Sequence, residues 1–230
     1  MSDLRQEQAA ATRERVVAAA AELFAERGYS GTTMPAIARR AGVSTETVQN
    51  HGRKVELLRA AIAAVSFGSA PGAAVAETAP GARLLAASSV EEAARLSAEL
   101  LATVNAGSHG VWMAFSEAAR SDPVLETELR RLTTEISAQN ETVLVRWAER
   151  GWLRTDLPLS DLVLRAAAIG AIELWDRIVR LDCHSREEYV ELVCGLLLDA
   201  LTFGADAAAE PMIRRTSPDE FDGRLESEQA

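Results

Sequence analysis

The sequence lacks the features that mark secreted, disulfide-bonded and membrane proteins. Only two of its 230 residues are cysteines, Cys183 and Cys194, which are too few for a disulfide scaffold and lack a paired zinc-site spacing. It contains no run of about 18 uncharged apolar residues, and its start, MSDLRQEQAA, lacks the hydrophobic core of a signal peptide. We therefore expect a cytoplasmic protein that makes no contact with a membrane.

The motifs of common enzyme classes are also missing. The chain has three histidines and no Gly-rich phosphate loop, nucleophile elbow or paired metal motif. Asp182, Cys183, His184 and Glu187 could be drawn together as metal ligands, but their spacing is not specific to a metal site. We expect a protein that is not an enzyme and that uses no cofactor.

Aromatic residues make up 5% of the sequence, runs of β-branched residues are few, and alanine is abundant. This composition favours an all-α fold. The length is sufficient for a small N-terminal domain followed by one larger domain with its own core.

The net charge of −10 would by itself argue against nucleic acid as a partner, but the charge is unevenly distributed. Residues 1–60 hold nine Lys and Arg against seven Asp and Glu, whereas the remaining 170 residues hold fifteen against 27. A weakly basic head in front of an acidic body is compatible with a protein that docks one end onto DNA.

Residues 33–58, TMPAIARRAGVSTETVQNHGRKVELL, have the pattern of two short helices joined by a tight turn. Thr33 can cap the first helix, with Pro35 tolerated in its first turn. Gly42 can adopt the positive φ that the reversal requires, and the hydroxyl of Ser44 can cap the second helix. Such a pair of helices is typical of a helix-turn-helix that reads DNA.

The second helix has one apolar residue, Val48, that can hold it against the head, and its other side chains are short and polar. In the major groove Gln and Asn can read adenine, and Thr can contact a base edge or a methyl group. Glu46 could accept a hydrogen bond from cytosine or only stabilise the helix start, and His51 could equally be a structural group. The candidate DNA-contacting residues here are Ser44, Thr45, Glu46, Thr47, Gln49, Asn50 and His51.

Arg53 and Lys54 stand at the start of the next helix, where the macrodipole disfavours positive charge. A DNA phosphate at this helix start would satisfy both the free N–H groups and the two cations. Lys54 is the only lysine of the chain. We expect both residues to contact the DNA backbone, and two solvated surface charges are the alternative.

Residues of about 12–60 resemble the N-terminal DNA-binding domain of the tetracycline-repressor (TetR) family of bacterial transcription regulators. The resemblance covers the first helix, TRERVVAAAAELFAERGYSGTT, both helices of the motif and the Lys54–Leu58 start of a fourth helix. Where such proteins usually carry aromatic residues before the basic turn, this chain has Gln49-Asn50-His51-Gly52 and is one residue shorter.

The resemblance implies a function for each part of the chain. It implies a helix-turn-helix DNA-binding domain over residues 1–58 and a helical ligand-binding and dimerisation domain over residues 59–204. It also implies that Lys54 contacts the DNA backbone and that Thr33 lies near a phosphate.

Helix caps and breakers subdivide the body. The mixture of glycine, proline and alanine in residues 67–82 predicts a loop. A capping box at Ser89 predicts a helix to about Asn105, and Gly107 and Gly110 predict a break before a further helix over residues 111–120. Asp122 and Pro123 then begin a long helix that ends near residue 151, and the acidic tail over 205–230 is expected to be disordered.

The last two long helices, over about 160–182 and 186–203, have apolar arcs too wide for one neighbour. A second copy of the same pair would cover them and give a four-helix interface across a two-fold axis. Similar regulators dimerise in this way and present two reading helices to a near-palindromic site on double-stranded DNA. A monomer with an unusually apolar core is the alternative. In the helix predicted over about 160–182, the residues that would let another backbone approach closely are Ala166, Ala167, Ile169, Gly170, Ala171 and Leu174.

Aromatic side chains with few polar groups lie on the helices that would surround the centre of the body. Such a lining would suit a hydrophobic or aromatic small molecule, although core packing is the alternative for each residue. The candidate ligand-binding residues are His109, Trp112, Met113, Phe115, Trp147 and Trp175.

Together these patterns predict a ligand-responsive, sequence-specific DNA-binding transcription regulator, a repressor that leaves its operator when a small molecule binds the body. The alternative is a helical homodimer that binds a ligand or a partner and whose DNA-binding head is degenerate.

Overall fold

The computed structural model describes residues 2–67 and 75–202, which contain helices and no strand. The all-α fold predicted from composition is therefore confirmed. The helices are α1 (Ser2–Gly31), α2 (Met34–Ala41), α3 (Thr45–Asn50), α4 (Lys54–Phe67), α5 (Ala79–Leu85), α6 (Val90–Ala119), α7 (Pro123–Glu149), α8 (Leu159–Ile169), α9 (Ile172–Trp175) and α10 (Arg186–Leu201), with a 3-10 turn η1 (Val75–Glu77) and a π-helical segment η2 (Asp176–Leu181).

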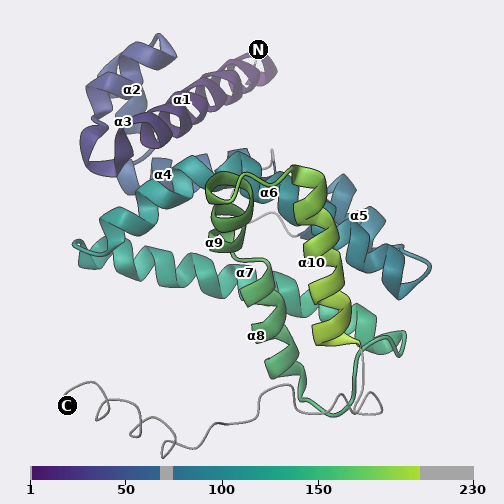
Figure 1. The fold of residues 1–230 in the computed structure, drawn as a ribbon. Coiled ribbons are helices and arrows are strands. Elements are labelled where there is room, and N and C mark those ends of the chain that lie inside the picture. The colour runs from purple at the N-terminus through teal and green to yellow at the C-terminus, as the bar shows by residue number, and fades with distance from the viewer. Residues whose placement is uncertain (1, 68–74, 203–230) are drawn as a thin grey trace, which may run out of the picture.

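The first three helices form a head that lies against one side of the larger helical body (Figure 1). Apolar residues recur at steps of three and four along α1, so Val16, Leu23 and Phe24 share one buried face. They pack with Ile37 of α2 and Val48 of α3 in one core. The fold of the head thus follows from the amphipathic pattern of its helices.

The core of the head continues into the body without a break. Val111 and Phe115 of α6 and Leu125 of α7 belong to the same buried cluster as the head residues. The predicted domain boundary at residue 58 falls within α4, and both Leu58 and Ala61 face this shared cluster. Head and body are therefore joined by packed side chains as well as by the chain itself.

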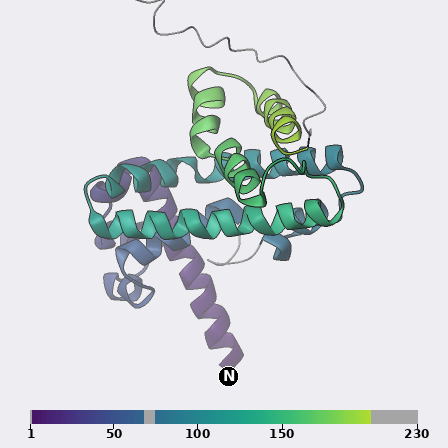
Figure 2. The same cartoon turned by 90° about the horizontal axis from the view of Figure 1, so that it is seen from below.

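A second core lies at the other end of α6. Four alanines of α6, from Ala93 to Ala102, pack with residues of α7, α8 and α10. Figure 2 shows α6 and α7 side by side across the body. Within this core the amide of Asn105 donates to the hydroxyl of Tyr189 at 3.1 Å and to the carbonyl of Gly170 at 3.3 Å.

The break predicted at Gly107 and Gly110 is wrong, because α6 is continuous from Val90 to Ala119. Both glycines instead permit close helix packing. A Cβ at Gly107 would lie 2.4 Å from the carbonyl oxygen of Val65 in α4, and one at Gly110 would lie 2.7 Å from the Cβ of Ala25 in α1. Tertiary contact, and not chain reversal, accounts for glycine at these positions.

Part of the loop predicted over residues 67–82 is helical. The turn η1 occupies 75–77, and α5 begins at Ala79, where the hydroxyl of Thr78 accepts the N–H of Gly81 at 3.1 Å. Residues 68–74 and the predicted tail over 205–230 lie outside the described residues.

The helix predicted over 160–182 is divided into α8, α9 and η2. Gly170 ends α8, and a Cβ there would meet Leu101 of α6 at 3.0 Å, so this glycine faces its own chain and not a second copy. The next helix begins as predicted at Arg186, where Ser185 and Glu188 form a capping box.

Replacement of Gly107 by alanine tests the packing of α6. Helix propensity alone would make Gly107→Ala more stable by about 1 kcal/mol. Because the new methyl group would collide with the backbone of α4, we expect instead a loss of about 1–3 kcal/mol. The sign of the change in thermal unfolding midpoint decides whether helix propensity or the steric collision dominates. An increase would contradict the observed packing.

Candidate DNA interface and effector region

The turn of the helix-turn-helix has the predicted caps. Thr33 has extended backbone angles and its hydroxyl accepts the N–H of Ala36 at 3.3 Å. Gly42 has a φ of 67°, in the left-handed region that favours glycine, and ends α2. The local structure that sets α3 against α2 is therefore built as the sequence predicts.

The helix α3 is held at its start by Ser44 and underneath by Val48. The Ser44 hydroxyl accepts the N–H of Thr47 at 3.0 Å and also lies 2.8 Å from the Thr47 hydroxyl. Val48 is fully buried in the core of the head. A short helix fixed in this way can present its outer face as a rigid surface.

None of the predicted DNA-contacting residues is fully buried. Thr45, Thr47, His51 and Lys54 are half-buried, and the exposed ones are Thr33, Ser44, Glu46, Gln49, Asn50 and Arg53. The structure thus brings all ten predicted residues to the motif, and their contacts with DNA stay a prediction.

Two features form the turn that follows α3. Gly52 has a φ of 133°, a conformation rarely available to other residues. The carbonyl of His51 accepts a hydrogen bond from the guanidinium of Arg13 in α1 at 3.4 Å. The shortened corner is therefore a well-formed turn tied to the first helix.

Glu56 compensates the positive charge at the start of α4. Its carboxylate accepts the backbone N–H of Arg53 at 2.7 Å and pairs with the Arg53 guanidinium at 2.9 Å. These contacts, the backbone one first, lower the pKa of Glu56. This contact is one half of a capping box, and the usual sequence signature is absent because Arg53, and not Ser or Thr, stands three residues before Glu56.

Lys54 does not project freely into solvent. Its Nζ atom lies 4.1 Å from the centre of the Tyr29 ring, at the end of α1. Burial lowers the pKa of the Lys54 ammonium. The ammonium for which we predict a phosphate contact is therefore already positioned by the Tyr29 ring.

The six predicted ligand-binding residues do not form one lining. Phe115 is fully buried in the core shared with the head, whereas Trp147 and Trp175 are buried in the second core. Met113 is partly exposed on α6. A single pocket enclosed by all six is therefore not present among the described residues.

Three of these residues lie within one turn or so of α6. Trp112 and Met113 follow His109 by three and four residues, so each of them is a neighbour of His109 on the surface of α6. The Nε2 atom of His109 lies 2.7 Å from a carboxylate oxygen of Asp176, which directly follows Trp175. The buried indole N–H of Trp112 has no hydrogen-bond acceptor among the described residues.

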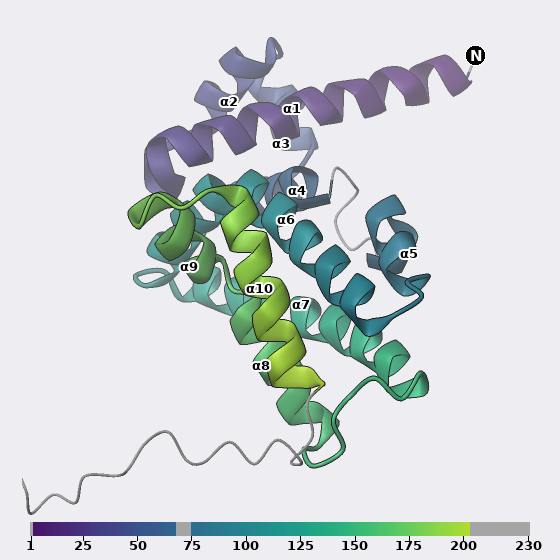
Figure 3. The same ribbon diagram turned by 45° about the vertical axis from the view of Figure 1, so that its right-hand side comes forward.

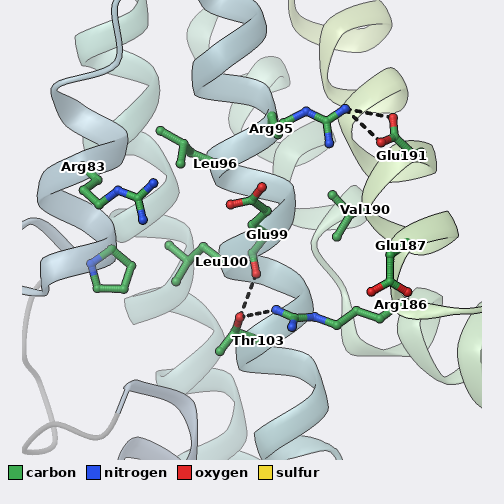
Figure 4. Close-up of a pocket in the computed structure, with 11 residues that line it drawn as sticks. Arg83, Arg95, Leu96, Glu99, Leu100, Thr103, Arg186, Glu187, Val190 and Glu191 are labelled. Carbon is green, nitrogen blue, oxygen red and sulfur yellow. Dashed lines mark hydrogen bonds and ion pairs between the residues drawn. The ribbon is translucent and has the colours of Figure 1, made fainter.

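A cavity of about 450 Å³ lies between α5, α6 and α10 (Figure 4). Figure 3 shows these three helices next to one another on one side of the body. Charged and apolar side chains both line the cavity, and among them Arg95 of α6 pairs with Glu191 of α10 at 2.9 Å. None of the six predicted ligand-binding residues lines it.

No group of three or more His, Cys, Asp or Glu side chains within 2–67 and 75–202 could hold a metal ion. No helix described there combines the length and the apolar character needed to span a bilayer.

Comparison with known proteins supports the N-terminal motif directly. Residues 16–61 match the family described as bacterial regulatory proteins, tetR family. These residues include α2, α3 and the start of α4. No curated protein matches the chain in sequence.

Solved structures share the fold over most of the chain. A putative TetR-family transcriptional regulator from Mesorhizobium loti is 17% identical with a TM-score of 0.65, over 85% of this chain and 98% of that one. NalD, the secondary repressor of the MexAB-OprM multidrug efflux pump in Pseudomonas aeruginosa, is 19% identical with a TM-score of 0.58, over 83% and 96%. SmeT in complex with triclosan is 20% identical with a TM-score of 0.64, over 84% and 92%. Residues 16–61 thus match the tetR family of bacterial regulatory proteins, and most of the chain shares the fold of these solved structures.

Proposed function

We propose that this protein is a cytoplasmic transcription regulator that binds specific DNA through α3 and is released by a small molecule bound in its body. One observation carries the proposal. The helix α3, capped by Ser44 and anchored by the buried Val48, exposes Glu46, Gln49 and Asn50 on a head that matches the tetR family. Side chains of these types read base edges in the major groove.

The proposed contacts divide into two kinds. Gln49 and Asn50 of α3 are the base-reading candidates, whereas Arg53 and Lys54 at the start of α4 are candidates for phosphate contacts. Because base contacts carry sequence information and phosphate contacts do not, the two kinds of residue should respond differently to substitution. The Thr47 hydroxyl is already engaged by Ser44, so Gln49 gives the clearer test.

Loss of Gln49 should reduce specificity, and loss of Lys54 should reduce affinity. We expect Gln49→Ala to weaken operator binding by about 1–3 kcal/mol and to relax the preference at particular base pairs. We expect Lys54→Ala to weaken binding to all sequences about equally and to reduce the slope of log affinity against log salt by about 0.9. Fluorescence anisotropy on operator and random duplexes at two salt concentrations measures both quantities.

Equal losses on operator and random DNA for both variants would contradict the assignment of α3 as the reading helix. A folded protein that prefers no sequence would instead favour the alternative, a ligand- or partner-binding homodimer with a degenerate head. The turn at His51 and Gly52 supports the proposal of a DNA-binding regulator. Although the segment there is one residue shorter than in typical sequences, the end of α3 is still held by the hydrogen bond from Arg13.

We also propose that two copies pair through α8 and α10. The side chain of Leu164 on α8 is 70% exposed, and Leu192 and Leu196 form an exposed stripe on α10. Gly195 between them has open space beyond its Cα. A second copy would cover this apolar face and place two α3 helices about one DNA turn apart on a near-palindromic operator.

A charged residue on this face should separate the copies. We expect Leu192→Glu to raise the dimer dissociation constant at least about 100-fold, because an unpaired charge in an apolar interface costs several kcal/mol. Val145→Glu is a matched control, since Val145 of α7 is 38% exposed and Leu192 is 40% exposed. Sedimentation velocity measures both. A Leu192→Glu protein that stays dimeric would contradict the proposed interface.

We propose that the effector is a hydrophobic or aromatic molecule that contacts His109, Trp112 and Met113 on α6, near Trp175. The unpaired indole N–H of Trp112 supports an effector that carries a hydrogen-bond acceptor. Phe115 and Trp147 would shape this region from within the two cores. Release from DNA requires that the effector bind the DNA-free conformation more tightly than the DNA-bound one.

A panel of hydrophobic aromatic compounds that includes triclosan, which SmeT binds, tests the effector proposal. We expect at least one compound to quench tryptophan fluorescence and to release DNA. Trp112→Phe should then require roughly 2- to 10-fold more of that compound, because one hydrogen bond is lost. Trp152→Phe serves as the control. Equal sensitivity of wild type and Trp112→Phe would remove Trp112 from the site.

A further inference from the structure

Lys54 lies where the head meets the body. A crevice of about 360 Å³ opens between the end of α1, the start of α4 and the corner that joins α6 to α7. Tyr29, Lys54 and Asp122 line it from these three places. The cation proposed to contact DNA therefore lies in a crevice where its own helix meets α1 and the α6–α7 corner.

The Tyr29 ring is supported by a buried aromatic neighbour. It stacks on Phe24 with the ring centres 5.7 Å apart and the planes at 18°, and Phe24 is fully buried. The Nζ atom of Lys54 lies 4.1 Å from the centre of the Tyr29 ring. Two rings of α1 and one cation of α4 thus form an ordered stack, in which the buried ring fixes the position of the outer ring.

This arrangement leaves the ammonium able to bind an anion. An ammonium over an aromatic face is attracted by the negative charge of the ring and does not spend its N–H donors on a specific acceptor. Within the described residues, Lys54 makes no hydrogen bond and no ion pair. All three donors therefore remain available for a phosphate.

The stack also removes a cost of binding. A lysine side chain has high rotamer entropy, part of which is lost when a phosphate fixes the ammonium. Burial of Lys54 opposes its charged form, and the ring face offsets that effect. An ammonium already held at one place binds a phosphate with a smaller entropy loss than a free one.

We infer that Tyr29 is a positioning residue for DNA binding, whose ring holds the Lys54 ammonium where it meets the DNA backbone. The inference rests on the proposed phosphate contact of Lys54. Because a phosphate carries no sequence information, Tyr29 affects affinity for every DNA sequence and leaves specificity unchanged.

A double-mutant cycle on the full chain tests the inference, and a random-sequence duplex at low salt is a sufficient probe. We expect Tyr29→Leu to weaken binding about two- to fivefold, the range given by a partly exposed cation–π contact. Tyr29→Phe keeps the ring and should bind like wild type. In the Lys54→Ala background, Tyr29→Leu should cause no further loss.

Arg53→Ala provides the matched control. Arg53 lies at the same helix start, but its contacts are with Glu56 and not with Tyr29. The effects of Tyr29→Leu and Arg53→Ala should therefore multiply. The thermal midpoint and the DNA-binding stoichiometry of each variant show whether weak binding comes from an unfolded head.

The outcomes separate the inference from the function on which it rests. If Tyr29→Leu weakens binding by the same factor with and without Lys54, Tyr29 only stabilises the head and the inference is wrong. If Lys54→Ala binds DNA like wild type, the phosphate contact and the inference fail together. If the folded wild type binds no DNA at all, the proposed function itself fails.

Discussion

The helix α6 contributes to both hydrophobic cores, and the arrangement of head and body depends on it. Its first half packs into the core of the body, and its second half contributes Val111 and Phe115 to the core of the head. Close approach to α4 and α1 is possible only because Gly107 and Gly110 lack side chains. The head is therefore packed onto the same helix that carries the proposed effector contacts.

Charged groups reinforce the connection between α4 and the body. The guanidinium of Arg59 in α4 pairs with Glu128 at 2.6 Å and with Glu135 at 3.1 Å, both on α7. All three side chains are partly withdrawn from solvent, so the pairs are screened less than surface pairs. Under the proposed function, a rearrangement of α6 and α7 would reach the phosphate-binding end of α4 through direct contacts.

Local signals in the sequence were sufficient for the head. The caps at Thr33 and Ser44, the turn at Gly42 and the buried Val48 each depend on residues within a few positions, and all are present in the structure. The contacts of Tyr29 with Lys54 and of Arg13 with His51 join residues far apart in sequence, so no local pattern predicts them.

The body was harder to predict because the roles of its glycines and aromatic residues depend on tertiary packing. Gly107 and Gly110 look like helix breakers in sequence, and Gly170 looks like a surface for a second copy, yet each faces another helix of the same chain. From the sequence, Phe115 and Trp147 are both candidates for ligand contacts, but in the structure they lie in different cores. Which apolar residue faces a cavity depends on the packing of several helices and not on periodicity.

Selection of bound fragments from sheared source-genome DNA, at two salt concentrations, tests the central claim that α3 reads a specific sequence. The account predicts enrichment of a near-palindromic site at both concentrations, with less total DNA retained at the higher one. Retention of DNA without any enriched sequence, by protein shown to be folded and dimeric, would contradict it.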